Sequence, residues 1–169
     1  MPKKRTKALD AIELLKKDHR RVEALFKQFE QLQEDDEEAA EPVIESICTE
    51  LKIHDKLETE LFYPAVREEA GDEEEDLLNE AEVEHTSVKS LIETIESLDP
   101  DDEKRNAHVT VLTEYVKHHV KEEEKELFPK VQKMEGLDLK ELGEQMKQRK
   151  TELMSEMGVE AEEEAEESA

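Results

Sequence analysis

One motif occurs twice in this chain, and that repeat restricts the possible fold more than any other feature of the sequence. The two copies are IHDKLETELFYPA at residues 53–65 and HHVKEEEKELFPKV at residues 118–131. In each copy a His is followed four residues later by a Glu, as His54 and Glu58 and as His119 and Glu123, and a proline stands ten residues after the His. On an α-helix, residues four apart differ by about 40° in direction and roughly 6 Å in height. The repeat therefore predicts two helices that each present a His–Glu pair on one face.

Hydrophobic residues recur at helical spacing along most of the chain, which predicts an all-α fold. The composition agrees, because helix-forming residues dominate and there are only four Gly and no Trp. Asp10 is placed to cap the first helix, and Pro42 suits the first turn of the second. The expected helices cover about residues 11–33, 42–67, 73–98, 102–134 and 139–157. Four long helices with short connections predict an up-down-up-down antiparallel four-helix bundle, and the last segment adds an extra C-terminal helix.

The same pattern divides the chain into four parts: a flexible N-terminus (1–9), the four-helix bundle (10–135), an accessory C-terminal helix (136–157) and a disordered acidic tail (158–169). The accessory helix is amphipathic, so we expect it to pack on the bundle or on another subunit, with the protein a monomer or a weak homodimer through this helix. The residues expected on inward helix faces include Ile12, Leu15, Val22, Leu51, Leu61, Leu78, Ala81, Leu112, Tyr115 and Leu127.

The charge balance excludes several classes of partner. With 24 basic and 49 acidic residues the formal charge is −25, which repels nucleic acid and anionic lipid. No apolar segment reaches the 18 residues that a membrane span needs, and the basic N-terminus has no apolar run behind it. We therefore expect a cytoplasmic protein. Cys48 is the one cysteine, which excludes an internal disulfide and a thiolate metal cluster and is explained as a small buried hydrophobe.

Two further histidines extend the repeat to four helices. His19 precedes His85 by 66 residues and His54 precedes His119 by 65, so the two helical hairpins look like copies related by a pseudo-twofold axis. That symmetry puts four histidines and two glutamates at a similar depth in the bundle. Imidazoles and carboxylates are costly to bury unless they are paired or bound to metal. A lone core His is more often structural, and a Glu in so acidic a chain is usually solvated, but neither explanation accounts for the spacing.

The donor set favours a dinuclear metal site. Imidazole with carboxylate suits iron, manganese or zinc, and six protein ligands are more than one tetrahedral ion needs. Two ions would share them, with two histidines on each ion, Glu58 and Glu123 bridging, and a solvent-derived oxo or hydroxo oxygen between. About five ligands per ion leave a position where a small molecule such as dioxygen can bind. Other polar residues receive non-ligand roles: His118, Glu122 and Glu124 on the surface, and His108 and Tyr115 in core packing.

These motifs resemble a hemerythrin-like (HHE cation-binding) domain over about residues 10–132. The matching segments are DHRRVEALF around His19, His54-x-x-x-Glu58, EHTSVKSLI around His85, and His119-x-x-x-Glu123 followed by ELFP. The resemblance implies a bundle around a non-haem di-iron centre, with His19 and His54 on one iron, His85 and His119 on the other, and Glu58 and Glu123 bridging.

This chain also departs from the oxygen-carrying hemerythrins. It has Ala81 where they carry a second third-helix His, and their last carboxylate is an Asp five residues after its His instead of a Glu at four. Some members of the family use an acidic residue directly after the second-helix His, which makes Asp55 an additional candidate ligand.

Three functions fit these features. The first is a protein that binds or senses dioxygen, nitric oxide or iron at a di-iron site. The alternative is a di-iron oxidoreductase that decomposes peroxide or another reactive species, and the incomplete five-histidine set favours it over simple oxygen storage. The third is a structural bundle with a fortuitous cluster of histidines. A ferritin-like carboxylate enzyme is disfavoured, because that class needs Glu-x-x-His on two helices and this chain has only Glu82-x-x-His85.

Overall fold

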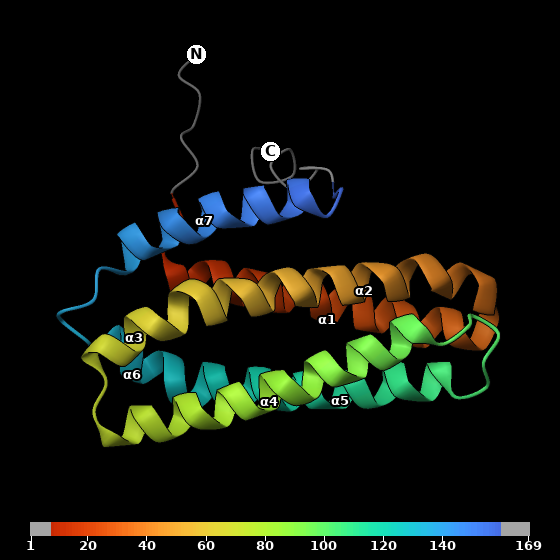
Figure 1. The fold of residues 1–169 in the computed structure, drawn as a ribbon, viewed down its shortest axis with the longest axis horizontal. Helices are drawn as coiled ribbons and strands as arrows, with labels where there is room; N and C mark the ends of the chain where they lie inside the picture. Colours follow the sequence, from red (N-terminus) through yellow and green to blue (C-terminus); the bar gives the residue numbers. More distant parts are fainter. Residues whose placement is uncertain (1–7, 160–169) are drawn as a thin grey trace, which may run out of the picture.

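The computed structural model describes residues 8–159, and these form an antiparallel bundle of four long helices with a further helix packed across it (Figure 1). The elements in chain order are α1 (Ala11–Asp35), α2 (Glu37–Leu57), η1 (Glu58–Phe62), α3 (Tyr63–Glu69), α4 (Asp72–Ser97), α5 (Arg105–Glu122), η2 (Glu123–Leu127), α6 (Phe128–Gln132) and α7 (Leu139–Glu156). Here η1 and η2 are single π-helical turns. The all-α bundle with an extra C-terminal helix is confirmed. Most of the predicted flexible N-terminus and acidic tail lies outside the described residues.

Local capping explains where the first two helices begin. The Asp10 carboxylate accepts a hydrogen bond of 2.9 Å from the Glu13 amide, as expected for the start of α1. The start of α2 was predicted at Pro42 but lies at Glu37, so a single residue separates the first two helices. The reason is Asp36, whose side chain accepts from the Ala39 amide, with acidic residues behind it that suit the positive end of a helix dipole.

The second and fourth long helices each change to a π turn that ends two residues before a proline. A proline has no N–H and its ring collides with the carbonyl four residues earlier, so a regular α-helix cannot continue through it without distortion. In η1 the Tyr63 amide donates to the Glu58 carbonyl, five residues back, and in η2 the Phe128 amide donates to the Glu123 carbonyl in the same way. Pro64 directly follows Tyr63, and Pro129 directly follows Phe128.

The π turn in η1 alters which side chains point inward. A π turn contains about one residue more than an α-helical turn. The side chains that follow it are therefore rotated relative to the α-helical register. Leu61, predicted to face the core, is only half-buried, whereas Phe62 and Tyr63 are almost fully buried. The turn therefore brings an aromatic hydroxyl into the bundle that the α-helical pattern does not predict.

Two apolar clusters fill the core, one on each side of the histidine level. One contains Leu15, Leu57, Ala81 and Leu127, and the other contains Val22, Leu51, Ile92 and Val116. On every long helix the histidine lies between residues of the two clusters, so the four imidazoles share one layer across the bundle. No helix within residues 8–159 combines the length and the apolar character needed to cross a bilayer.

Helix α7 packs on its own bundle, against α1, α2 and η1. It buries Leu142, Met146 and Leu153 in the same apolar cluster as Leu15 and Leu57. At Gly143 the two backbones come very close: a Cβ added there would lie 2.6 Å from the Leu9 carbonyl oxygen. A glycine is therefore required where α7 crosses the beginning of α1.

We predict that Gly143→Ala lowers the free energy of unfolding by about 1–3 kcal/mol, because the added methyl group forces the backbones apart. In an unobstructed helix the same change would stabilise the protein by about 1 kcal/mol. Urea denaturation followed by circular dichroism measures the difference, with Glu144→Ala on the exposed face of α7 as the control. A more stable Gly143→Ala protein would contradict the observed packing.

Candidate metal centre

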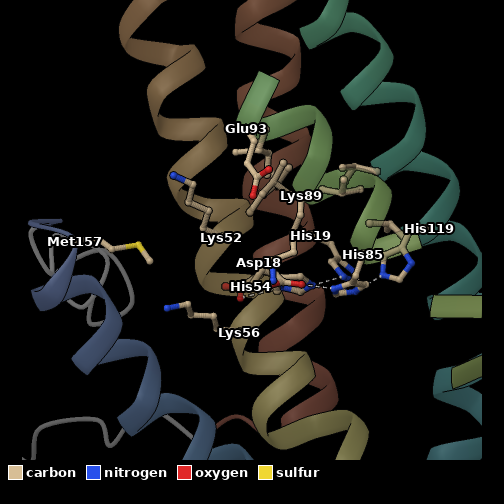
Figure 2. Close-up of a pocket in the computed structure, with 17 residues that line it drawn as sticks. Asp18, His19, Lys52, His54, Lys56, His85, Lys89, Glu93, His119 and Met157 are labelled. Carbon is tan, nitrogen blue, oxygen red and sulfur yellow. Dashed lines mark hydrogen bonds and ion pairs between the residues drawn. The ribbon is translucent and has the colours of Figure 1, made fainter. Parts of the chain in front are cut away.

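Four helices and two π turns each supply one side chain to a buried polar cluster in the middle of the bundle. Figure 2 shows the histidines from separate helices meeting in this layer. All six side chains singled out in the sequence are present and buried: His19 on α1, His54 on α2, Glu58 at the start of η1, His85 on α4, His119 on α5 and Glu123 at the start of η2. The carboxylate of Glu58 is completely shielded from solvent, with 0% of the residue exposed.

The four imidazoles form two pairs through their Nε2 atoms. The Nε2 atoms of His19 and His54 are 3.2 Å apart, and those of His85 and His119 are also 3.2 Å apart. Two cis nitrogen ligands with bond lengths of about 2.1 Å to one ion lie about 3 Å from each other. Each pair is therefore spaced to hold a single ion, and the pairs are those that the family resemblance implies.

Both glutamates contact both imidazole pairs. Glu123 lies with Oε1 3.3 Å from Nε2 of His19 and Oε2 3.1 Å from Nε2 of His119. Glu58 Oε1 lies 2.9 Å from Nε2 of His54 and 3.2 Å from Nε2 of His85. A carboxylate shared by two cations has this arrangement, so the geometry suits glutamates that bridge two ions.

A second ring of carboxylates fixes the orientation of the imidazoles. Each Nδ1 atom lies within hydrogen-bond distance of one carboxylate oxygen: Glu124 for His19 (2.9 Å), Asp18 for His54 (3.2 Å), Asp55 for His85 (2.6 Å) and Glu84 for His119 (3.0 Å). An ionised carboxylate only accepts hydrogen bonds, so Nδ1 must carry the proton. The Nε2 lone pairs then point into the cluster, which is the tautomer that metal-binding histidines adopt.

The cluster needs added positive charge at its centre. With Nδ1 protonated, the inward Nε2 lone pairs face each other and face carboxylate oxygens that are acceptors as well. Three of these oxygens, Oε1 and Oε2 of Glu58 and Oε1 of Glu123, are buried without a hydrogen-bond donor. Such acceptors are costly to bury unless cations lie between them. The residues present therefore fit a pair of metal ions.

Protonation of the histidines is the alternative way to supply this charge. Burial lowers the pKa of His54, but the carboxylates of Glu58 and Asp18 outweigh that effect and raise it to about 10. For His85, burial also lowers the pKa, and Asp55 and Glu58 raise it to about 9. The pKa of the Glu58 carboxyl is held well below its ordinary value. Burial raises this pKa, but the neighbouring histidines lower it by more. Protons and metal ions therefore compete for the same nitrogens.

Tyr63 is a polar group of this cluster that the sequence analysis did not identify. Its hydroxyl donates a hydrogen bond of 2.6 Å to Oε2 of Glu123 and lies 3.0 Å from Nε2 of His85. Burial, together with the charges of Glu123 and Glu58, raises the pKa of the phenol well above its ordinary value, so it is neutral near pH 7. Aligning the two motif copies by their prolines places Tyr63 opposite Phe128, and that comparison could have revealed it.

The two halves of the cluster therefore differ. Around His85 and His119 the structure gathers both glutamates and the phenol of Tyr63. In the other half the ring of Phe128 lies parallel to that of His19, with a centroid separation of 6.0 Å. One half thus has an additional polar group, and the other has an apolar aromatic wall.

Asp55, which was left open as an additional ligand, is directed at Nδ1 of His85, because its short side chain leaves α2 on a different face from His54. Two other residues have roles that differ from those expected. Glu124, assigned to a solvated face, bonds His19 and Arg20 instead, and its side chain is only 20% exposed. Tyr115, expected to pack in the core, is 46% exposed.

Helix α7 also contacts this outer ring of carboxylates. Lys150 on α7 donates a hydrogen bond of 2.7 Å to Asp18, whose other oxygen lies 3.2 Å from Nδ1 of His54. His118, next to His119, projects to the surface as expected, with 63% of its side chain exposed. Cys48 is buried, which raises the pKa of its thiol to about 11, in keeping with a packing role.

Comparisons with known proteins agree with this geometry. The model of the hemerythrin HHE cation-binding domain matches residues 10–131. A solved hemerythrin HHE cation-binding domain-containing protein from Mycobacterium kansasii has a TM-score of 0.71 with 22% identity, covering 88% of this chain and 89% of that one, a likeness that shows the fold. A protein from Nostoc sp. described as a DNA nickase is 28% identical over 116 residues, which are 69% of this chain and 32% of that protein. The chain thus spans about a third of that relative's length.

The raised histidine pKa values predict that the metal-free protein loses stability in alkaline solution. A histidine whose pKa rises from 6.5 when unfolded to about 9 or about 10 when folded contributes stability in full below pH 6.5. That contribution disappears as the pH rises through the folded values. We expect the free energy of unfolding to fall by several kcal/mol between pH 7 and pH 10, since each unit of raised pKa corresponds to about 1.4 kcal/mol.

Urea denaturation of chelator-treated protein at a series of pH values measures this loss. Val111→Ala, which changes an exposed residue of α5 without a titratable group, should leave the pH profile unchanged. A profile that is flat or rises between pH 7 and pH 10 would show that the buried histidines are neutral in the metal-free protein.

Proposed function

Because this chain belongs to the hemerythrin HHE cation-binding domain family, we propose that its His/Glu cluster binds two iron ions and serves to bind or sense a small molecule such as dioxygen or nitric oxide. One observation carries the proposal: two Nε2 pairs, each 3.2 Å apart, lie in a buried layer with two carboxylates that contact both pairs.

In this proposal each ion has its own histidines. His19 and His54 hold one ion, and His85 and His119 hold the other, while Glu58 and Glu123 bridge them. Iron in such a centre supplies reversible binding of small ligands or electron transfer to them. Manganese and zinc share the preference for imidazole and carboxylate, so we base the choice of iron on the family resemblance. Asp18, Asp55, Glu84 and Glu124 fix the orientations of the histidine ligands through hydrogen bonds to their Nδ1 atoms.

Tyr63 supports a second candidate function, the decomposition of peroxide. Its neutral phenol lies 2.6 Å from Glu123 and 3.0 Å from His85, inside the cluster. A proton donor held at the reacting group is typical of general acid catalysis, and reversible binding of a diatomic molecule does not require one. We therefore propose peroxide turnover as the alternative to ligand binding, with Tyr63 as the proton donor.

We do not propose a nickase activity for this chain. The matched region is about a third of that protein, so its nickase activity can belong to parts that have no counterpart here. The formal charge of −25 also opposes binding to the phosphates of DNA.

Metal analysis of the purified protein tests the proposed centre. We expect about two iron ions per chain, and nearly complete loss of iron in the double variant His54→Ala/His119→Ala, because each substitution removes one member of a pair. The control is His108→Ala, which removes a histidine that belongs to none of the possible metal-binding groups of the described residues. Iron-free wild-type protein, or equal iron in the double variant and the control, would reject the site.

Replacement of the two tyrosines separates ligand binding from peroxide turnover. If the phenol donates a proton, Tyr63→Phe should slow the loss of added peroxide by about 100-fold while the iron content stays the same. Tyr115→Phe, at the other tyrosine of the chain, should have no effect, since that side chain is exposed. Equal rates for wild type and Tyr63→Phe would remove the support for peroxide turnover, and a reversible absorption change on cycling oxygen would then favour binding.

A further inference from the structure

A cavity of about 260 Å³ leads from the surface to the histidine layer (Figure 2). It lies between the two helical hairpins, with α2 and α4 on its two sides. All four histidines of the cluster line its inner end, and its walls are the apolar side chains of Val22, Leu51, Val88, Ile92, Val116 and Val120. Five of these six are among the buried residues of one apolar cluster, so the wall belongs to the rigid core of the bundle.

The size of this cavity exceeds what a diatomic ligand needs. An apolar cavity of about 150 Å³ holds one benzene molecule, so 260 Å³ corresponds by proportion to about ten non-hydrogen atoms. Dioxygen and nitric oxide each contain only two non-hydrogen atoms. Apolar pockets of this kind bind organic molecules, with a few polar groups that determine orientation.

The cavity is lined by three lysines and three acidic residues. The lysines are Lys52, Lys56 and Lys89, and the acidic residues are Asp18, Asp55 and Glu93. Lys52 is paired with Glu96 at 2.5 Å, and Lys89 lies 3.7 Å from Asp55.

Lys56 is the cation at the mouth of the cavity without a carboxylate partner. The side chain is half-buried, and no carboxylate within residues 8–159 forms an ion pair with it. Figure 2 shows its amine directed to the same side of the cavity as Met157, away from His119. A partly buried ammonium group without a counter-ion is a binding position for one anionic group.

We propose that this cavity binds an organic monoanion with an apolar chain of about eight to ten carbons, of the medium-chain carboxylate class. The chain lies among the valines and Ile92 and reaches the histidine layer, and the carboxylate pairs with Lys56 at the mouth. The functional role of this ligand rests on the proposed metal centre, which it would reach through the cavity. Binding of the ligand to the cavity does not require the metal.

Isothermal titration of the purified full-length chain with decanoate tests the proposal. We expect binding with a Kd of about 10–100 μM. Decyltrimethylammonium, which has the same chain and the opposite charge, should bind at least about tenfold more weakly. Lys56→Gln should weaken decanoate binding by about three- to tenfold, whereas Lys121→Gln, the same change at an exposed position on α5, should have no effect.

Blocking the cavity tests its location. Val88→Trp fills the space between the hairpins and should abolish decanoate binding, and Val88→Phe is a smaller change to use if the Trp variant fails to fold. In methyl NMR spectra, decanoate should shift the signals of Val88 and Val116, whereas Val66, in the other apolar cluster, should not move.

The outcomes separate this inference from the proposed metal centre. If the wild-type protein purifies without iron and still binds decanoate, the cavity is supported and the metal centre is rejected. Iron-containing protein that does not bind decanoate at about 1 mM would overturn the inference alone, and the cavity would then be a route for diatomic molecules. Equal binding of the anionic and cationic chains, or binding unaffected by Val88→Trp and Val88→Phe, would overturn it as well.

Discussion

The carboxylates of Glu58 and Glu123 lie in the centre of the bundle, out of contact with water, and the rest of the structure compensates for their burial. Removing a carboxylate from water costs several kcal/mol unless a cation lies beside it. The four imidazoles direct their Nε2 atoms toward these carboxylates. They keep that orientation because each Nδ1 donates a hydrogen bond to a carboxylate of the outer ring. The outer carboxylates matter as much as the inner ones, because rotation of any ring would remove a nitrogen from the centre.

Much of this arrangement can be predicted from spacing alone. The His-x-x-x-Glu repeat and the intervals of 65 and 66 residues place six side chains at one depth, and the structure brings all six together. The outer carboxylates cannot be predicted in this way. In a chain with 49 acidic residues, Glu84 and Glu124 have no sequence feature that separates them from solvated neighbours. Tyr63 was missed for another reason: its inward direction depends on a π turn, and helical periodicity assumes 3.6 residues per turn throughout.

The two halves of the polar cluster differ at one pair of corresponding positions. Tyr63 and Phe128 occupy equivalent positions before the two prolines and differ by one hydroxyl group. That hydroxyl lies near His85 and His119, whereas the ring of Phe128 stacks on His19. Two ions held here would therefore differ in environment, one beside a hydrogen-bond donor and the other beside an apolar wall.

The two π turns also bear on how the chain arose. Both begin at the glutamate that faces the centre and both end before a proline, so the extra residue stands at the same point in each half. Two independent insertions at matching positions are a more complicated history than one insertion inherited twice. The matching turns agree with the duplication of one helical hairpin that already contained the widened turn.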